Sequence, residues 1–564
     1  MIGLIVFGMI LRVWGLNFGL PYSFHQDEPV VINHALAYGT GDFNPHFFVI
    51  PPLVSYILFF GYGVFFLLGR IFGIFASVQD FALKFFLDPT AFYLIARVIL
   101  GVLPGTKIIG LTYLLYKKNF GKSGALFAAL LMASNYLSVA NAHYAYADNW
   151  MVVFVLSTYL ALSCMMQEPW LKNYIKSAVM LGLAVSAKYN AALLGLSFWV
   201  AHTNVVIQRK GKAKEVLFDH YLWIAFGGAI LIFLITNPFA VLDTGFFLNQ
   251  VLHKIRSGYM GWTYHIFYSL KEGIGPLFTI AGLLGFAFIF KKESLKKGLF
   301  FISFPLAFYL HLSLKSQPFS RYALALVPFL AITSSFLLFK ILSASARNLF
   351  AKISVILIGA LLFIPTFAKT LKSDILFSGP DTRTISAKWI EDNLPPYTKI
   401  AVDHTSFRPQ IIQTKEQLME KFDLIGNQEG LKNLKKDKIR LQLMAIENKK
   451  TYTIYFLSSD DTQDIEFVSM APAIPYNLNN LIQMGVEYVV INYNLTDDKK
   501  NAFIHELSQK GVLVAQFSPY YDQKIRYPYD MIDMTCMSVG SQEIFSRAMT
   551  GPSLVIYKIK AIKE

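Results

Sequence analysis

Two neighbouring carboxylates, Asp27 and Glu28, follow the first apolar segment, within the run His25-Gln26-Asp27-Glu28-Pro29. A third acid, Asp148, appears after two later apolar segments. A carboxylate beside hydrocarbon is costly to keep there, so an acid in this position is a candidate functional group. Such groups are suited to deprotonating a hydroxyl, as general bases. The alternative interpretation is that Asp27 and Glu28 are solvated loop charges.

Cations and aromatic residues also follow apolar segments, as the pairs Lys188-Tyr189 and Arg321-Tyr322. Arginine binds a phosphate through a bidentate fork and lysine binds it as a point charge. A transferase that uses a lipid phosphate needs carboxylates and cations on one side of the membrane. Both pairs could instead anchor helix ends at the interface. His143 could equally be a structural residue of the interface.

The elements that carry these residues are predicted to be membrane helices. The chain has 564 residues, of which 54% are hydrophobic and only 15% are charged. Apolar runs of about 17–25 residues recur as far as Leu371, long enough to cross a bilayer. They lack the alternation of an outer-membrane barrel. We therefore predict a polytopic α-helical membrane domain over residues 1–372.

The composition changes after this point. Charged residues become frequent, and short β-rich runs alternate with helical ones, as in a water-soluble α/β domain. We predict such a domain over residues 373–564. Its strands are expected near Ile400–Val402, Thr453–Phe456, Val486–Asn492 and Ser553–Ile559. We expect the domain to cover the outer cavity or to recognise the acceptor.

Basic clusters predict which ends of the helices face the cytoplasm. They lie at Lys117–Lys122, Arg209–Lys214 and Lys291–Lys297, with a weaker one at Arg347–Lys352. Asp27 is predicted to lie outside and Lys117 inside, so an odd number of crossings must separate them. Two apolar segments are available between these residues, and we predict that the first, Leu53–Phe75, lies in the interface instead of crossing. This gives 11 spans in the cytoplasmic membrane, with the candidate site and the C-terminal domain outside. The net charge of +15 follows from the positive-inside rule, so we predict no nucleic-acid partner.

Four short patterns resemble the GT-C membrane glycosyltransferases, in the branch of protein O-mannosyltransferases and lipid A aminoarabinose transferases (glycosyltransferase family 39-like). The first two are the Phe24–Pro29 acidic run and the Pro51-Pro52-Leu53 start of an interfacial helix. The third is the stretch from Phe120-Gly121-Lys122 to Asp148. The fourth combines Gly182-Leu183-Ala184 and Lys188-Tyr189-Asn190 with Arg321-Tyr322 and Pro328-Phe329. The resemblance rests on the order of these patterns along the chain and on their predicted position on the same side of the membrane.

The resemblance implies an inverting transfer of one sugar from a polyprenyl-phosphate carrier to a hydroxyl acceptor, which could be protein, lipid or glycan. By this analogy Asp27 is the general base, Glu28 positions the acceptor or Asp27, and Asp148 shapes the pocket. The departing phosphate is then held by Lys188, Tyr189, Arg321 and Tyr322, and His46 and His143 are assigned to the acceptor pocket. The branch requires no divalent metal, although one bridging Asp27, Asp148 and the phosphate remains an alternative.

Two other classes of protein are compatible with the sequence. Charge pairs at mid-membrane and inverted repeats would indicate a transporter or flippase of lipid-linked glycans. Neither feature is visible, because the acids cluster at one edge and the two halves of the membrane domain differ. The second class is an inactive scaffold that keeps the fold, against which the presence of Asp27 argues.

Overall fold

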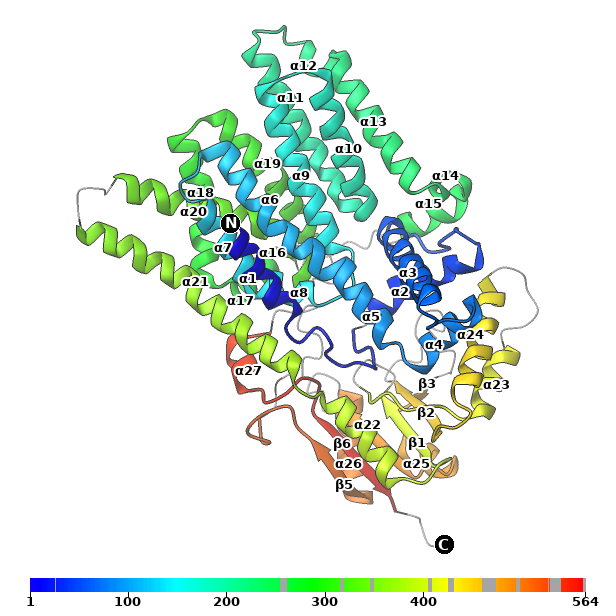
Figure 1. The fold of residues 1–564 in the computed structure, drawn as a ribbon. Helices are drawn as coiled ribbons and strands as arrows, with labels where there is room; N and C mark the ends of the chain where they lie inside the picture. The colour runs from blue at the N-terminus through cyan, green and yellow to red at the C-terminus, as the bar shows by residue number, and fades with distance from the viewer. Residues whose placement is uncertain are drawn as a thin grey trace.

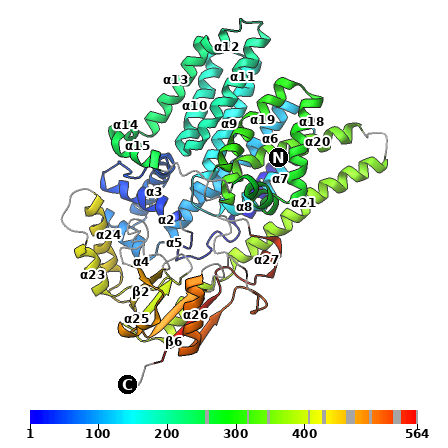
Figure 2. The same ribbon diagram turned by 180° about the vertical axis from the view of Figure 1, so that it is seen from behind.

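In the computed structural model, a bundle of long helices carries an α/β domain at one end (Figure 1). The view from behind shows the same two layers, with the helices α2–α5 between them (Figure 2). The structure describes residues 1–25, 27–253, 261–314, 319–344, 349–403, 408–424, 431–458, 473–492, 498–525, 527 and 539–560.

The N-terminal two thirds of the chain is helical. Its elements are α1 (Ile2–Val13), α2 (Glu28–Ala37), η1 (Tyr38–Thr40), α3 (Leu53–Ile71), α4 (Val78–Leu87), α5 (Thr90–Arg97), η2 (Val98–Val102), α6 (Leu103–Phe120), α7 (Ala125–Ser134), α8 (Tyr136–Ala142), α9 (Asp148–Gln167), α10 (Leu171–Ala187), η3 (Tyr189–Leu193), α11 (Leu194–Gln208), α12 (Glu215–Phe218), α13 (His220–Thr236), α14 (Phe239–Leu242), α15 (Thr244–His253), α16 (Gly261–Tyr264), η4 (His265–Leu270), α17 (Lys271–Ile274), α18 (Pro276–Lys292), α19 (Leu295–Ser313), η5 (Ser320–Leu326), α20 (Val327–Ala344) and α21 (Leu349–Ser378).

Within the described residues, seven helices are long and apolar enough to cross a membrane, or nine if two bent pairs each count as one span. The sequence predicted 11. The difference arises in part because α1 has only 12 residues and α10 only 17. The helix α3, for which we predicted an interfacial position, has the length and hydropathy of a span; its interfacial position stays a prediction.

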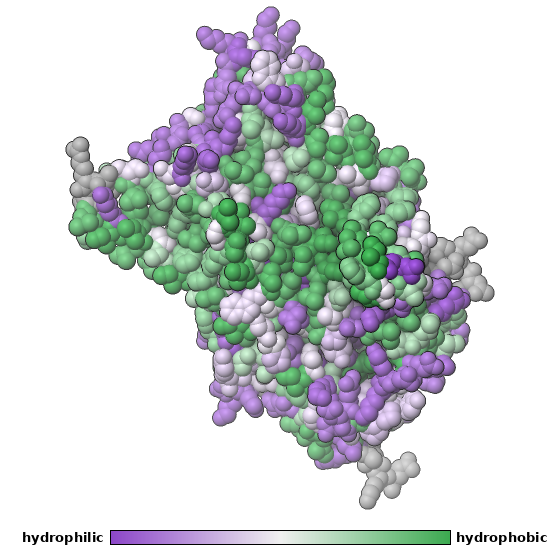
Figure 3. Space-filling model, viewed as in Figure 1, coloured by the Kyte–Doolittle hydropathy of each residue, from purple (hydrophilic) through white to green (hydrophobic). Residues whose placement is uncertain are grey.

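The surface of the bundle is a broad apolar belt with hydrophilic residues at both ends (Figure 3). Three basic clusters share the end opposite the α/β domain. Lys297 Nζ donates to the Asn119 carbonyl over 2.8 Å, and Asn204 Nδ2 donates to the Lys296 carbonyl over 3.3 Å. These contacts join the Lys117–Lys122, Arg209–Lys214 and Lys291–Lys297 regions, as the topology scheme predicted for one face.

The C-terminal region folds into a six-stranded sheet with the order β3-β2-β1-β4-β6-β5. Strands β1 to β4 are parallel, and β6 runs antiparallel to both of its neighbours. The elements are α22 (Thr382–Asn393), β1 (Lys399–Asp403), α23 (Lys415–Leu424), α24 (Leu431–Ala445), β2 (Thr453–Ser458), β3 (Ala473–Pro475), α25 (Leu478–Gln483), β4 (Tyr488–Asn492), α26 (Asp498–Lys510), β5 (Gly511–Phe517), α27 (Ser541–Ser546) and β6 (Leu554–Ile559). All four predicted strands are confirmed as β1, β2, β4 and β6.

The α/β domain packs directly on the membrane region. Helix α21 runs without a break through the predicted boundary at 372–373 and ends at Ser378. The Arg383 guanidinium of α22 lies 3.7 Å from the centre of the Phe24 ring, in the first loop. On the other side, Glu272 Oε2 accepts from Lys369 Nζ at 3.2 Å and from the Ser541 N–H at 3.0 Å. The domain is therefore fixed beside the loop that carries Asp27.

Candidate active site

Four charged side chains from distant parts of the sequence meet at the lower end of the bundle. Arg321 Nη2 lies 2.6 Å from Asp27 Oδ2, and Arg321 Nε lies 3.9 Å from Asp148 Oδ2. Lys188 Nζ donates to Asp148 Oδ1 over 2.6 Å. The result is a row of alternating charges in the order Asp27, Arg321, Asp148, Lys188, which we call the charged row.

Each member of the charged row stands at the end of a helical element. Asp27 directly precedes α2 and Asp148 is the first residue of α9, where the positive end of a helix dipole favours a carboxylate. Lys188 directly follows α10, and Arg321 lies in η5, just before α20. Helix ends hold these side chains at one level because the helices themselves are packed rigidly in the bundle.

Exposure differs sharply along the charged row. The side chains of Asp148 and Arg321 are 3% and 5% exposed, whereas that of Asp27 is 28% exposed. Asp27 is therefore the carboxylate that an incoming molecule can reach. A general base needs this access, since it must come within hydrogen-bond distance of the proton it removes.

Two tyrosine rings line the cations. The Arg321 guanidinium is 4.8 Å from the centre of the Tyr146 ring, and Lys188 Nζ is 4.7 Å from the centre of the Tyr322 ring. Burial and the nearby Asp27 carboxylate raise the pKa of Tyr146, so its hydroxyl stays protonated near neutral pH. Sequence reasoning named Tyr322 but missed Tyr146, although it stands only two residues before Asp148.

Glu28 has a different environment from its neighbour Asp27. Its two carboxylate oxygens accept from Arg97 Nε and Nη2, both at 2.9 Å, and the Ala145 N–H donates to Oε1 over 3.0 Å. Both side chains of this pair are completely buried. Arg97 Nη1 also donates to the carbonyls of Leu16 and Phe18. Glu28 thus ties the first loop to the 144–147 loop and touches no reachable surface.

Close packing around Arg97 depends on glycine. The helix that carries Arg97 continues through η2 into α6, and a Cβ placed on Gly101 would lie 2.2 Å from the Ala142 carbonyl oxygen. Any larger residue at this position would push α6 away from the end of α8. The loop that follows α8 carries Ala145 and Tyr146, so this contact helps to place one wall of the site.

The remaining predicted site residues lie outside the charged row. His143 is buried, with its ring nitrogens 2.9 Å from the carbonyls of Val139 and Trp14, which suits a structural role. The Tyr189 ring packs against Phe233 and Phe247. His46 pairs with Asp42, with 2.9 Å between Nε2 and Oδ2, in the loop before α3. The topology scheme also predicts Lys315 on the outer face, and this residue lies outside the described residues.

The space between Asp27 and Asp148 is occupied by the Arg321 guanidinium. A divalent ion bridging the two carboxylates would have to displace it. Across the described parts of the chain, no three His, Cys, Asp or Glu side chains gather closely enough to hold a metal ion. In this arrangement Arg321 and Lys188 provide the positive charge.

Three solved structures are similar to the chain over nearly its whole length. ArnT from Cupriavidus metallidurans in the apo state has a TM-score of 0.49 and 14% identity, covering 99% of this chain and 98% of that one. The same protein bound to undecaprenyl phosphate has a TM-score of 0.46 and 11% identity, covering 98% and 97%. The Archaeoglobus fulgidus oligosaccharyltransferase tethered with an acceptor peptide has a TM-score of 0.48 and 13% identity, covering 97% and 76%.

No curated protein is significantly similar in sequence. A family model does match part of the chain, over residues 77–241. This stretch contains Asp148 and Lys188, and the match agrees with the resemblance found from the short motifs. Residues 77–241 are thus similar to the family described as dolichyl-phosphate-mannose-protein mannosyltransferase.

Proposed function

We propose that the protein is an inverting glycosyltransferase that moves one sugar from a polyprenyl-phosphate donor to a hydroxyl acceptor. The observation that carries this proposal is the charged row, in which a reachable carboxylate lies 2.6 Å from a guanidinium, and a second carboxylate pairs with both that guanidinium and a lysine. The family match over residues 77–241 supports the same chemistry.

In the proposed reaction, Asp27 removes the proton from the acceptor hydroxyl while that oxygen attacks the anomeric carbon of the sugar. The bond between this carbon and the phosphate oxygen breaks, and the electron pair leaves with the lipid phosphate. Negative charge therefore grows on the phosphate, where Arg321 and Lys188 stabilise it. Attack from the side opposite the leaving group inverts the configuration at the anomeric carbon.

Asp148 is assigned to positioning in this scheme. It accepts a hydrogen bond from Lys188 and faces Arg321, so it holds both cations at the place where the phosphate would bind. Tyr322 and Tyr146 supply aromatic faces that fix the directions of the two cations. Glu28 and Arg97 keep the Asp27 loop in place from behind.

The orientation of the site is also proposed. The three joined basic clusters lie at the end of the bundle away from the α/β domain, and such clusters face the cytoplasm. We therefore place the charged row and the α/β domain on the outer face of the cytoplasmic membrane. Membrane lipids surround the apolar belt in this arrangement.

The experiment uses membranes containing the full chain and a panel of radiolabelled polyprenyl-phosphate sugars. We expect the wild type to transfer label from one donor, and Asp27→Asn to lose the activity. Asp437→Asn, an exposed acid of α24 paired with Arg440, is the matched control and should transfer normally. Equal transfer by wild type and Asp27→Asn would refute the assignment of the base, and no transfer from any donor would refute the proposed function.

A further inference from the structure

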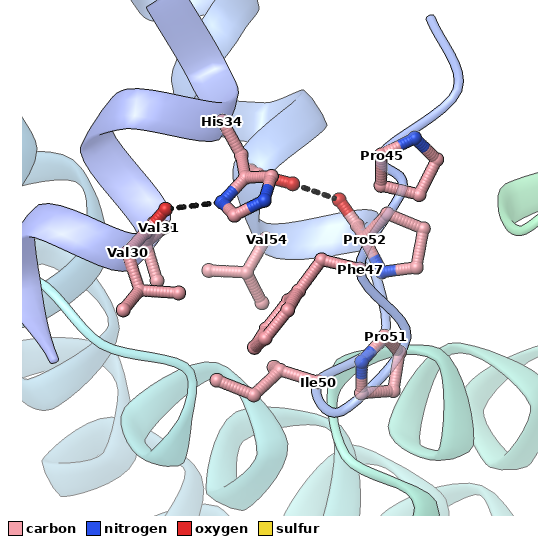
Figure 4. Close-up of a pocket in the computed structure, with 10 residues that line it drawn as sticks. Val30, Val31, His34, Pro45, Phe47, Ile50, Pro51, Pro52 and Val54 are labelled. Atoms are coloured by element: carbon pink, nitrogen blue, oxygen red, sulfur yellow. Dashed lines mark hydrogen bonds between the residues drawn. The ribbon is translucent and has the colours of Figure 1, made fainter. Parts of the chain in front are cut away.

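The small hollow beside α2 is mostly apolar and closely filled by its own side chains (Figure 4). The ring centres of His34 and Phe47 lie 5.0 Å apart, which leaves no room for a ligand group between them. His34 Nδ1 already lies 2.5 Å from the Val30 carbonyl oxygen, and Ser55 Oγ donates to the Pro52 carbonyl over 2.8 Å. A more open group of polar side chains lies in the α/β domain.

Two buried donor atoms of the α/β domain have no acceptor within the described parts of the chain. They are Nη1 of Arg408, in the segment that follows β1, and Nε2 of Gln413, a little further along the same segment. A buried donor without a partner costs free energy, because folding removes the water that satisfied it. Unpaired donors of this kind indicate a place where a water, an ion or a ligand supplies the acceptor.

Lys421 of α23 joins these two side chains into one group. Its Nζ donates to Gln413 Oε1 over 2.5 Å, which assigns the amide oxygen to the side of the ammonium and leaves Nε2 as a donor. The same Nζ lies 6.0 Å from the centre of the Phe456 ring of β2, and the Arg408 guanidinium lies 4.2 Å from that ring centre. Three donors therefore meet beside β2, and we call Arg408, Gln413 and Lys421 the donor cluster.

Hydrogen bonds to β2 and to the residue before it hold the donor cluster in place. Gln417 of α23 donates to the Ile454 carbonyl and accepts from the Ile454 N–H, both over 2.9 Å. The Tyr452 N–H donates to the Ile412 carbonyl over 2.8 Å, and the Thr414 N–H donates to the Tyr452 carbonyl over 3.1 Å. The segments that carry the donor cluster are thus fixed, so a ligand would meet donors that are already in position.

The donor cluster carries more positive charge than its surroundings balance. Burial lowers the pKa of Arg408 to about 10, and the charge of Asp403, the last residue of β1, offsets this only in part. Asp403 already accepts from Lys500 Nζ over 3.0 Å. Burial also lowers the pKa of Lys421 to about 8, together with repulsion from Arg408 and from Lys438 of α24. A bound anion would relieve this repulsion.

The donor cluster belongs to the layer where the α/β domain meets the membrane region. Figures 1 and 2 both show α23 and α24 beside α4. Lys449 Nζ, in the turn after α24, donates to the Leu87 carbonyl at the end of α4 over 3.3 Å. The side chains of the donor cluster are half-buried, so part of each stays open to solvent. Both a lipid headgroup and a soluble molecule could therefore reach them.

We propose that the donor cluster binds a phosphate group, carried by a lipid headgroup or by a soluble phosphoester. Arginine takes two phosphate oxygens through its planar fork, lysine supplies a point charge, and the Gln413 amide donates to a third oxygen. A carboxylate fits less well, because it offers only two oxygens to donors from three side chains. The site shares no residue with the charged row and does not depend on the proposed function.

The first test reads the occupancy of the site at Lys421. The full-length protein, in nanodiscs of phosphatidylcholine, is acylated at constant ionic strength, and the modification of each lysine is followed by mass spectrometry. Inorganic phosphate at about ten times its dissociation constant should slow acylation of Lys421 about 10-fold, because the free fraction falls as 1 + [L]/Kd rises. Lys510, an exposed lysine paired with Glu506, is the matched control and should react equally with and without phosphate.

Two substitutions separate a phosphate site from a group of merely solvated cations. Arg408→Met keeps an apolar stem over Phe456 but removes the charged fork, so phosphate should bind about 10–100-fold more weakly, the value of a hydrogen bond to a charged group. Gln413→Glu places a carboxylate beside both cations, so it should abolish the protection of Lys421 and raise the unfolding temperature without phosphate. Equal protection in the wild type and in Arg408→Met would overturn the proposal, and so would retained protection in Gln413→Glu.

The lipid composition of the nanodiscs decides which source supplies the phosphate. If the source is a headgroup, nanodiscs that also contain phosphatidylglycerol should protect Lys421 before inorganic phosphate is added, and this protection should be lost in Arg408→Met. Protection that requires added phosphate in both bilayers assigns the site to a soluble phosphoester. A wild type whose Lys421 is protected under none of these conditions would overturn the proposal.

Discussion

Two adjacent acids of this protein, Asp27 and Glu28, each meet an arginine, and the two pairs differ in almost every other respect. The pair of Glu28 with Arg97 is bidentate and completely buried, with further hydrogen bonds to backbone groups on both sides. The pair of Asp27 with Arg321 leaves the carboxylate 28% exposed. The first arrangement holds two loops together, whereas the second keeps a carboxylate and a cation available to a substrate.

The largest expected effect concerns the exposed acid. In Asp27→Asn the amide keeps the shape of the side chain but cannot take a proton, so transfer should fall by about 10²–10⁴-fold. Thermal unfolding of the purified variant should stay close to that of the wild type, because Asp27 is partly solvated. A markedly lower unfolding temperature of the variant would show that Asp27, like Glu28, is a structural acid.

Arg321→Lys should give the next largest loss. Lysine keeps the positive charge but lacks the planar fork that reaches both Asp27 and Asp148. We expect kcat to fall by about 10–100-fold, which is less than removal of an entire transition-state contact costs. Steady-state kinetics with the donor varied would show this. The Arg209→Lys variant, at the opposite end of the bundle, should retain wild-type kcat.

Substitutions in the buried pair of Glu28 and Arg97 should change the stability of the protein rather than the rate of sugar transfer. Arg97→Ala leaves the Glu28 carboxylate buried without its partner, which should lower the free energy of unfolding by about 3–5 kcal/mol. The double variant Glu28→Leu/Arg97→Met should recover part of this loss. Recovery stays incomplete because the carbonyls of Leu16 and Phe18 still lack their donor. Denaturation of detergent-solubilised protein would measure all three; equal stability of Arg97→Ala and wild type would contradict the comparison.

The smallest effect is expected at Tyr146. Tyr146→Leu removes the aromatic face beneath Arg321 while keeping an apolar side chain. A partly buried cation–π contact contributes about 1–2 kcal/mol, so the KM for the donor should rise roughly 5–30-fold. Tyr146→Phe keeps the face and should behave almost as wild type. If both substitutions raise KM equally, the hydroxyl and not the ring is the important group.

Much of the charged row could be inferred from the sequence because topology constrains it. Asp27, Asp148, Lys188 and Arg321 all stand at junctions between apolar segments, and the positions of the basic clusters assign those junctions to one face. The partner of each acid could not be inferred. Successive helical residues point about 100° apart, so Asp27 and Glu28 face different neighbours although they look equivalent in the sequence.

The environment of Arg97 and part of the sheet also could not be inferred from the sequence. Arg97 is a charged residue within an otherwise apolar stretch of the sequence, which marks it as unusual, yet only the packing of α5 on the first loop reveals Glu28 as its partner. The strands β3 and β5 escaped prediction for local reasons. β3 has three residues, and β5 is an edge strand whose residues are all half-buried or exposed, without a regular alternation.

Helix α21 has 30 residues and continues from the apolar belt to within four residues of α22. A helix of this length measures about 45 Å, some 15 Å more than the hydrocarbon core of a bilayer. The α/β domain is therefore joined to the membrane region by a continuous helix and not by a flexible linker. A thinner membrane would tilt this helix more strongly and carry the domain with it, so we expect the thickness of the bilayer to set the angle at which the domain stands above the lipid surface.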